Sequence, residues 1–213
     1  MTRICMISDT HEQHSQIIGM EQADILLHAG DITYQGAYDK LLEFDEWLDS
    51  LDSKFSYKHK VIIPGNHERT FEQDWDTAAA HIPAADAILN GETYEAEGLK
   101  IYGEPRQPWF YDWAFNIKRE SMNFVWDKVP TDTDVLLTHG PPLGVGDRTS
   151  RGEHVGCAEQ RKWILAHQPK LVVCGHIHEG YGIYILGRTV VVNASICTSK
   201  YAPTNRAVTV DIC

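Results

Sequence analysis

The chain has 213 residues, of which 43% are hydrophobic and 23% charged, and its formal net charge is −11. This length and composition favour a single globular domain over residues 1–213, and no apolar run approaches the ~20 residues of a membrane-spanning helix. The acidic balance argues against nucleic acid or an anionic membrane as a partner. The first residues lack the long apolar region and cleavage site of a signal peptide, so we expect a cytoplasmic protein.

Five short apolar runs predict strands that are buried on both faces. In chain order they cover residues 4–7, 25–29, 61–63, 135–138 and 171–174, and each ends in polar residues. Apolar side chains recur at helical spacing over residues 41–51 and 157–167, which predicts an amphipathic helix in each segment. This alternation of strand and helix predicts an α/β protein with a largely parallel sheet and helices on its outer faces.

Two turn signals predict β-hairpins. The Asn90-Gly91 dipeptide lies between two strand-like pairs at 88–89 and 93–94, and Gly187 separates residues 182–186 from residues 188–193. From these hairpins we expect a second, more antiparallel sheet that packs against the first.

Each of the five runs is followed by Asp, His or Asn, at the edge where ligands bind in α/β sheets. The seven candidate metal ligands are Asp9, His11, Asp31, Asn66, His139, His176 and His178. In the pairs Asp-x-His and His-x-His, an extended backbone directs both side chains to one side. Imidazole, carboxylate and amide groups together suit Mn, Fe, Zn or Co better than Mg or Ca.

Seven ligands are too many for one tetrahedral zinc and suit two divalent or trivalent transition-metal ions. Asp31 is the expected bridge, because a carboxylate has two oxygens and this one lies centrally in the series. Two divalent ions carry +4, while two carboxylates and a bridging hydroxide carry −3, so the site keeps about one positive charge that attracts phosphate. We also expect bound metal to raise thermal stability.

The order Asp-x-His, Gly-Asp, Gly-Asn-His-Glu, His and Gly-His-x-His resembles the signature of the calcineurin-like metallophosphoesterase superfamily. The resemblance implies a four-layer α/β/β/α sandwich, with two mixed sheets flanked by helices. It implies one ion held by Asp9, His11, Asp31 and His178, and a second held by Asp31, Asn66, His139 and His176. It does not imply that His67 binds metal directly.

A narrower resemblance points to the metallophosphoesterase-domain-containing protein subgroup. It is carried by Gln107-Pro108-Trp109-Phe110 and by residues 138–144, 178–182, 193–195 and 203–205. Members of that subgroup hydrolyse phosphodiesters, including cyclic nucleotides, so we expect a small phosphodiester or nucleotide substrate.

The expected reaction is attack of a metal-bridging hydroxide on phosphorus. Asn66 and His67 are then the catalytic candidates, because both can stabilise charge on the phosphoryl oxygens. His67 is also the candidate general acid for the leaving oxygen, since an imidazole titrates near neutral pH.

Several other residues are candidates for supporting roles. His28 is a candidate to support the ligands from behind, and His154 is a candidate substrate contact in the glycine-rich segment 140–156, which could form a lid. Arg106 and the aromatic residues Trp109, Phe110, Tyr111 and Trp113 either line the pocket, where they would stack a base, or pack in the core. The remaining histidines, His14, His59, His81 and His167, are expected to face solvent.

Alternative functions remain open at this point. A phosphomonoesterase or phosphoprotein phosphatase of the same superfamily is disfavoured, because those phosphatases carry Asp-Arg-Gly after the second motif and no arginine follows Asp31 here. The net charge argues against a nuclease, and the late position of His-x-His argues against a metallo-β-lactamase-like hydrolase. A metal-dependent nucleotide-binding protein with low turnover would keep the same ligands.

Overall fold

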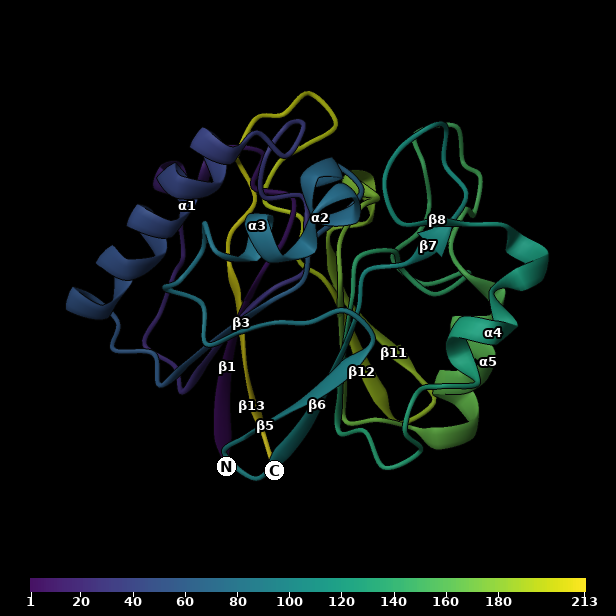
Figure 1. Cartoon of the computed structure of the whole chain (residues 1–213). Coiled ribbons are helices and arrows are strands. Elements are labelled where there is room, and N and C mark those ends of the chain that lie inside the picture. Colours follow the sequence, from purple (N-terminus) through teal and green to yellow (C-terminus); the bar gives the residue numbers. More distant parts are fainter.

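Two β-sheets pack face to face at the centre of the molecule, and helices cover both outer faces (Figure 1). The computed structural model describes all residues from Met1 to Cys213. The first sheet has the order β13-β1-β2-β3-β4. Its strands are β1 (Thr2–Ile7), β2 (Ile25–His28), β3 (His59–Ile62), β4 (Ala87–Ile88) and β13 (Val208–Ile212). They are parallel except for β13, which pairs antiparallel with β1.

The second sheet has the order β11-β12-β10-β9-β6-β5. Its strands are β5 (Glu92–Ala96), β6 (Leu99–Glu104), β9 (Val135–Thr138), β10 (Leu171–Cys174), β11 (Gly182–Leu186) and β12 (Thr189–Asn193). The four central strands are parallel, and the outer strands β11 and β5 run antiparallel to their neighbours. Both sheets are therefore mixed, and β7 (Gln107–Pro108) pairs with β8 (Asn116–Ile117) outside them.

Buried apolar side chains form three clusters, one at each interface between layers. Successive residues of a strand point to opposite faces of its sheet, so Leu27 and Leu137 pack between the two sheets. Their neighbours Leu26 and Leu136 point outward, to the helices. The outer helices are α1 (Tyr38–Ser50), α2 (Arg69–Gln73) and α3 (Trp75–Ala79) on the first sheet, and α4 (Asn123–Trp126) and α5 (Ala158–His167) on the second. The prediction of a four-layer α/β/β/α sandwich is confirmed.

Two sequence expectations about the sheets were wrong. The Asn90-Gly91 turn does not close a hairpin, because β4 pairs in parallel with β3 while β5 belongs to the other sheet. This turn carries the chain from one sheet to the next, and β5 instead turns back into β6 through Glu97-Gly98. The five apolar runs do not share one parallel sheet either, since three lie in the first sheet and two in the second. The hairpin around Gly187 is confirmed as β11 and β12.

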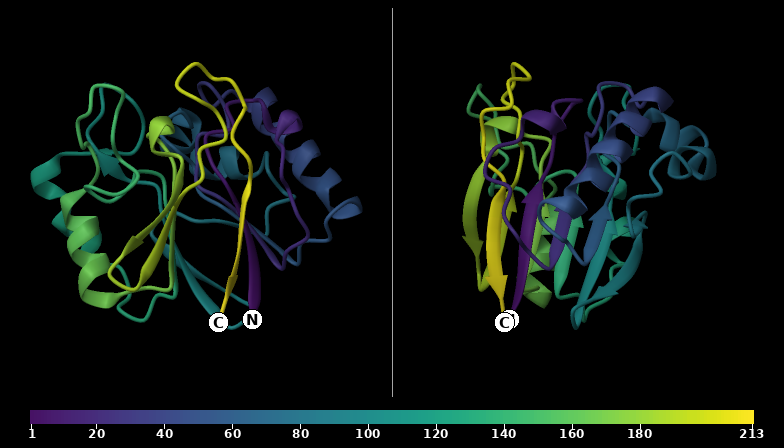
Figure 2. Two further views of the ribbon diagram at one scale, coloured as in Figure 1. Left: turned by 180° about the vertical axis from the view of Figure 1, so that it is seen from behind. Right: turned by 90° about the vertical axis from the view of Figure 1, so that its left-hand side faces the viewer.

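The parallel strands of both sheets end at the same edge of the sandwich, and both chain termini lie at the opposite edge (Figure 2). Thr2 pairs with Ile212 at that far edge. The loops that carry the candidate ligands therefore lie away from the termini. None of the helices combines the length and apolar character needed to span a bilayer.

Candidate metal centre

Loops that follow strands of both sheets bring the seven candidate ligands together. β1, β2 and β3 of the first sheet precede Asp9, Asp31 and Asn66, and β9 and β10 of the second precede His139 and His176. The backbone has a positive φ at Asp9 (51°), His11 (41°), Asp31 (56°) and His176 (64°), a conformation that costs about 1–3 kcal/mol for a non-glycine residue. Such strain at four candidate ligands indicates that the fold positions these side chains at an energetic cost.

Two glycines let the carboxylates approach the neighbouring loops. A Cβ atom at Gly65 would lie 2.2 Å from Asp31 Oδ1, and one at Gly175 would lie 2.0 Å from Asp9 Oδ2. Both distances are far below van der Waals contact, so any larger residue would displace a carboxylate. The glycine before Asn66 and the glycine before His176 are therefore part of the site.

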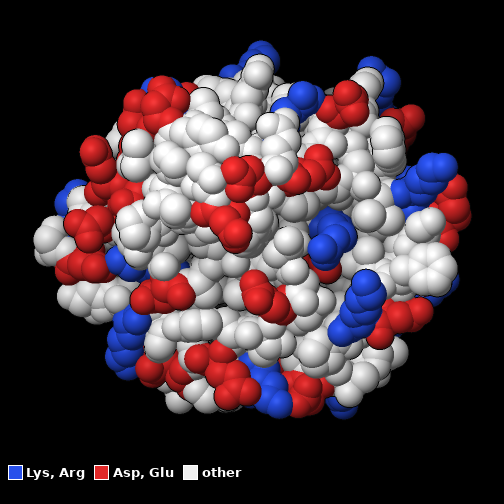
Figure 3. All heavy atoms as spheres, viewed as in Figure 1, with Lys and Arg blue, Asp and Glu red and all other residues white.

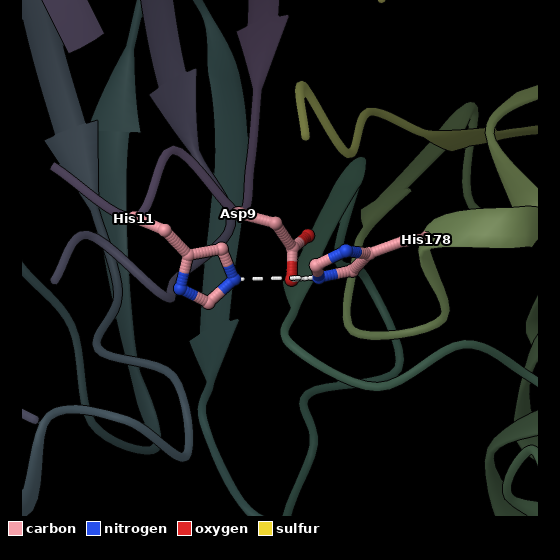
Figure 4. Close-up of side chains that lie close together, drawn as sticks. All are labelled: Asp9, His11 and His178. Carbon is pink, nitrogen blue, oxygen red and sulfur yellow. Dashed lines mark hydrogen bonds and ion pairs between the residues drawn. The ribbon is translucent and has the colours of Figure 1, made fainter. Parts of the chain in front are cut away.

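The first group of ligands comprises Asp9, His11 and His178. The three side chains point toward one another (Figure 4), and Asp9 Oδ1 is 3.3 Å from His178 Nε2. The His11 Nε2 atom is 3.3 Å from His178 Nε2. Ligand atoms of all three residues lie within 4.8 Å of one another.

The second group comprises His139, His176 and Asn66. The His139 Nε2 atom lies 2.9 Å from Asn66 Oδ1 and 3.3 Å from Asp31 Oδ1. The His176 ring lies 5.0 Å from the His139 ring, centroid to centroid. Asp31 joins the groups, because its second oxygen, Oδ2, lies 3.8 Å from His11 Nε2.

The orientation of the imidazoles fits metal ions. His11 Nδ1 lies 3.1 Å from the Thr33 carbonyl oxygen, and His178 Nδ1 lies 2.9 Å from that of Thr198. His139 Nδ1 lies 2.8 Å from the Ala29 carbonyl oxygen. A carbonyl only accepts, so each Nδ1 carries the proton and each Nε2 faces the centre, as in metal-binding histidines. Nitrogen atoms that face one another across the site need a proton or a cation between them.

The charges of the metal-free protein also indicate a site for cations. Burial alone would lower the pKa of His139 and His178, but the carboxylates of Asp31 and Asp9 raise both values to about 9. These imidazoles in turn hold the pKa of Asp9 and of Asp31 below the usual range, against the effect of burial. Two imidazolium groups thus balance two carboxylates, and cations would replace those protons.

Glu68, to which the sequence assigned no role, connects the ligand loops. Its Oε2 accepts hydrogen bonds from the backbone N–H groups of Asp31 (2.9 Å) and Gly65 (2.7 Å), and its Oε1 accepts from that of Thr33 (2.9 Å). The carboxylate is fully buried. Its place at the end of Gly-Asn-His-Glu was the available signal, but the residues that it contacts are distant in sequence.

Asn193 and Ser195 stabilise the opposite side of the site. In the sequence analysis, their segment contributed to the subgroup resemblance but was given no role. The Asn193 side chain donates to the carbonyl oxygens of Ile177 (2.9 Å) and Gly146 (3.0 Å). The Ser195 hydroxyl donates to Asp9 Oδ2 over 2.8 Å. Together they fix Asp9 and the loop that carries His176 and His178.

His67 lies at the edge of the ligand cluster and lines the cavity above it. Its Nδ1 is 2.6 Å from the Tyr34 carbonyl oxygen, which leaves Nε2 available, 3.9 Å from Asp31 Oδ2. The ring stacks on Trp113 with centroids 4.2 Å apart. Trp113 thus orients His67. From the sequence we expected Trp113 either to line the pocket or to pack in the core, and neither expectation included this contact.

The remaining histidines divide into three kinds. His28 is fully buried behind the cluster, where Nδ1 accepts from the Gly30 N–H (3.1 Å) and Nε2 lies 3.0 Å from Thr10 Oγ1, so it supports two ligand loops. The expectation that four histidines face solvent holds for His167 but was wrong for three. His14 is buried against Phe44 and Trp47, His59 is half-buried against Tyr94, and His81 is half-buried against Tyr38.

A cavity of about 660 Å³ lies above the cluster. Its floor includes Asp31, Asn66, His67, His176 and His178. One wall is the segment 107–111, where Trp109, Phe110 and Tyr111 are 54%, 42% and 73% exposed, and another is the loop 140–156. Arg106 and His154 lie outside this cavity, because Arg106 pairs with Glu104 and His154 pairs with the buried Asp147.

Comparisons with known proteins agree with this geometry. The sequence model of calcineurin-like phosphoesterases matches residues 2–180. Metallophosphoesterase domain-containing protein 1 of Homo sapiens is 38% identical across 99% of this chain and 71% of its own length, and so is that of Mus musculus. The probable glycerophosphodiester phosphodiesterase GpdQ of Arcobacter nitrofigilis is 26% identical, across 73% of this chain and 56% of its own length. The solved structure of TT1561 of Thermus thermophilus shares the fold, with a TM-score of 0.63, 15% identity, and coverage of 90% of this chain and 88% of that one.

Proposed function

This chain belongs to the calcineurin-like phosphoesterase family and is thus a metal-dependent phosphoesterase, and we propose that it hydrolyses small phosphodiesters, cyclic nucleotides among them. The observation that carries the proposal is the cavity of about 660 Å³ directly above the ligand cluster. It exceeds the needs of a bare phosphate and falls in the range of pockets that bind organic ligands. The exposed rings of Trp109, Phe110 and Tyr111 offer stacking surfaces for a planar substituent.

The similarity to a probable glycerophosphodiester phosphodiesterase supports a diester substrate. A small substrate is favoured over nucleic acid by the net charge of −11. On the face seen in Figure 3, acidic and basic side chains are interspersed, and no broad basic surface is present there. We therefore propose a substrate that enters the cavity as a whole.

The residues on the cavity floor have distinct tasks in this reaction. Two bound ions, for which Mn, Fe, Zn and Co are the candidates, would supply Lewis acidity and an activated water. Asp31 would hold both ions, and Asn66 would orient the phosphoryl group from the side of His139. His67 Nδ1–H donates to the Tyr34 carbonyl oxygen, so Nε2 can hold the proton that the leaving oxygen takes up.

Hydrolysis of bis-p-nitrophenyl phosphate and of p-nitrophenyl phosphate, each with added Mn²⁺, tests the proposal. We expect the diester to be the better substrate, and a His67→Ala variant to lose about 10²–10⁴-fold in kcat. His81→Ala is the matched control, because His81 contacts Tyr38 and the Thr77 carbonyl oxygen, away from the cavity. Equal rates for His67→Ala and the wild-type protein would remove His67 from the mechanism.

Phosphomonoester hydrolysis is the second candidate, because two arginines line the cavity. Arg119 donates to the Gly156 and Val155 carbonyl oxygens, while Arg151 forms no ion pair and is free to contact a phosphate dianion. A higher kcat/KM for p-nitrophenyl phosphate than for the diester would favour this reading. No turnover of either ester with any of the four metals would instead favour a nucleotide-binding protein.

A further inference from the structure

Gln107 has a buried side chain whose hydrogen-bonding atoms are unpaired. It lies in β7, is 1% exposed, and lines the cavity above the ligand cluster. Its backbone N–H donates to the Phe115 carbonyl oxygen over 3.0 Å, but neither Oε1 nor Nε2 of its side chain has a partner. Buried amide groups are nearly always paired, so an unpaired one needs an explanation.

The position of this amide relates it to the ligands. Gly140 directly follows His139, and a Cβ atom added at Gly140 would lie 3.4 Å from Gln107 Cβ and 3.7 Å from Gln107 Oε1. The amide thus borders the loop that holds His139. The Thr149 hydroxyl, on the loop 140–156 and also lining the cavity, is a second buried group without a partner. Unpaired polar groups therefore lie on two walls of one cavity.

We propose that the Gln107 side-chain amide binds the phosphoester substrate, a role that rests on the proposed function. Its NH₂ group donates to an oxygen of the phosphoryl group, and its carbonyl oxygen accepts from a hydroxyl or N–H of the organic substituent. An amide offers both a donor and an acceptor without placing a negative charge beside the phosphate. The terminal torsion of glutamine is broad, so its rotation sets which of the two amide atoms faces the phosphoryl group.

Gln107→Met tests this role, because methionine keeps the length of the side chain and removes its hydrogen bonds. We expect kcat/KM for bis-p-nitrophenyl phosphate to fall about tenfold, the effect of one lost hydrogen bond to a charged group. The thermal midpoint should stay equal or rise, since no protein partner is lost. Gln107→Glu, which is isosteric and places a negative charge by the phosphate, should reduce kcat/KM further.

Gln160→Met is the matched control for stability. Gln160 is equally buried, at 1% exposure, but its amide is paired with Thr138 Oγ1 over 2.9 Å. Its replacement should therefore lower the thermal midpoint, in contrast to that of Gln107. A similar loss of midpoint in Gln107→Met would overturn the proposal, because it would show that the amide has a structural partner.

Kinetics that are unchanged in Gln107→Met would overturn it as well. If the wild-type protein hydrolyses no phosphodiester, the proposed function fails by itself, and the affinity of the metal-loaded protein for inorganic phosphate then decides on Gln107. Binding about tenfold weaker in Gln107→Met than in the wild-type protein supports the proposal. Equal affinities contradict it.

Discussion

The two oxygens of the Asp31 carboxylate face different groups of ligands. Oδ1 lies 3.3 Å from His139 Nε2, and Oδ2 lies 3.8 Å from His11 Nε2. The backbone N–H of His67 also donates to Oδ1, over 2.9 Å. The two oxygens thus approach an Nε2 atom of each group, so the account of a shared ligand depends on this residue.

Asp31→Asn should therefore reduce the metal content from two ions per chain to one or none, because an amide supplies one neutral oxygen in place of a carboxylate. Hydrolysis should fall about 10²-fold or more. Elemental analysis after dialysis measures the content. Asp147→Asn is the matched control, since Asp147 is equally buried but accepts hydrogen bonds from Gly144 and Gly156 in the loop 140–156. Two ions retained in Asp31→Asn would speak against the bridge.

The raised pKa values of His139 and His178 predict how the metal-free protein responds to pH. Both are about 9 in the folded state, against an ordinary value near 6.5 in the unfolded chain. Between these values His139 and His178 bind more protons in the folded than in the unfolded state, so their contribution to stability falls as pH rises. Burial lowers the pKa of His11 and His14 to about 4 and that of His28 and His176 to about 3, so these four offset the fall near pH 6.5. Above about pH 7.5 they are neutral in the unfolded chain as well, and the fall from His139 and His178 remains.

We therefore expect the thermal midpoint in EDTA to decrease from about pH 7.5 to pH 9. With saturating Mn²⁺ the decrease should be smaller, because the metal replaces those protons. Thermal denaturation at several pH values, with and without the metal, measures both curves. A midpoint in EDTA that rises over this range would contradict the charges assigned to His139 and His178.

Which residues of the site could be predicted depended on the kind of signal that each carries. The ligand positions followed from short motifs, because a metal needs particular donor types at particular spacings. No role was predicted for Glu68, because it acts through hydrogen bonds with Asp31 and Thr33, which are more than 30 residues away in sequence. No role was predicted for the Gln107 side chain either, because what distinguishes it is that its amide has no hydrogen-bond partner, which only the structure shows. His14 resembled a surface residue in sequence, and only its packing on Phe44 shows it to be buried.

At the scale of elements, the Glu68 carboxylate ties the loops after β2 and β3 together. Glu68→Gln keeps the shape but turns an NH₂ group toward backbone N–H donors. We expect a loss of about 3 kcal/mol in the free energy of unfolding, from two hydrogen bonds to a charged group. Urea denaturation of the metal-free protein measures it, with Glu72→Gln as the control, because Glu72 accepts one hydrogen bond, from Phe115. Equal stability of the two variants would show that Glu68 does not hold these loops.

The strands themselves were well predicted, and their pairing less so. Runs of four residues identified β9 and β10 from end to end, because burial on both faces leaves only apolar residues in β10 and, before the terminal Thr138, in β9. The Asn90-Gly91 turn misled because a turn signal does not reveal which strand lies beside which. Ile88 pairs with Ile62 of the first sheet and Glu92 pairs with Gly103 of the second, long-range choices that are decided by packing.

For the whole molecule, metal binding should stabilise the packing of one sheet on the other. Asp9, His11, Asp31 and Asn66 follow strands of the first sheet, while His139, His176 and His178 follow strands of the second. Mn²⁺ at about 100 times its Kd should add about 2.7 kcal/mol, or roughly 5–10 °C in the thermal midpoint of a chain of this size. Thermal denaturation with and without Mn²⁺ measures the shift, and no shift at saturation would argue against a site between the sheets.

The most direct test of the account is anomalous X-ray diffraction from crystals of the Mn²⁺-loaded protein. Two anomalous peaks are predicted, roughly 3.5–4 Å apart, one near Asp9 and His178 and one near Asn66 and His139. The Asp31 carboxylate should lie between them. A single peak, or peaks remote from these side chains, would contradict a dinuclear centre assembled from both sheets.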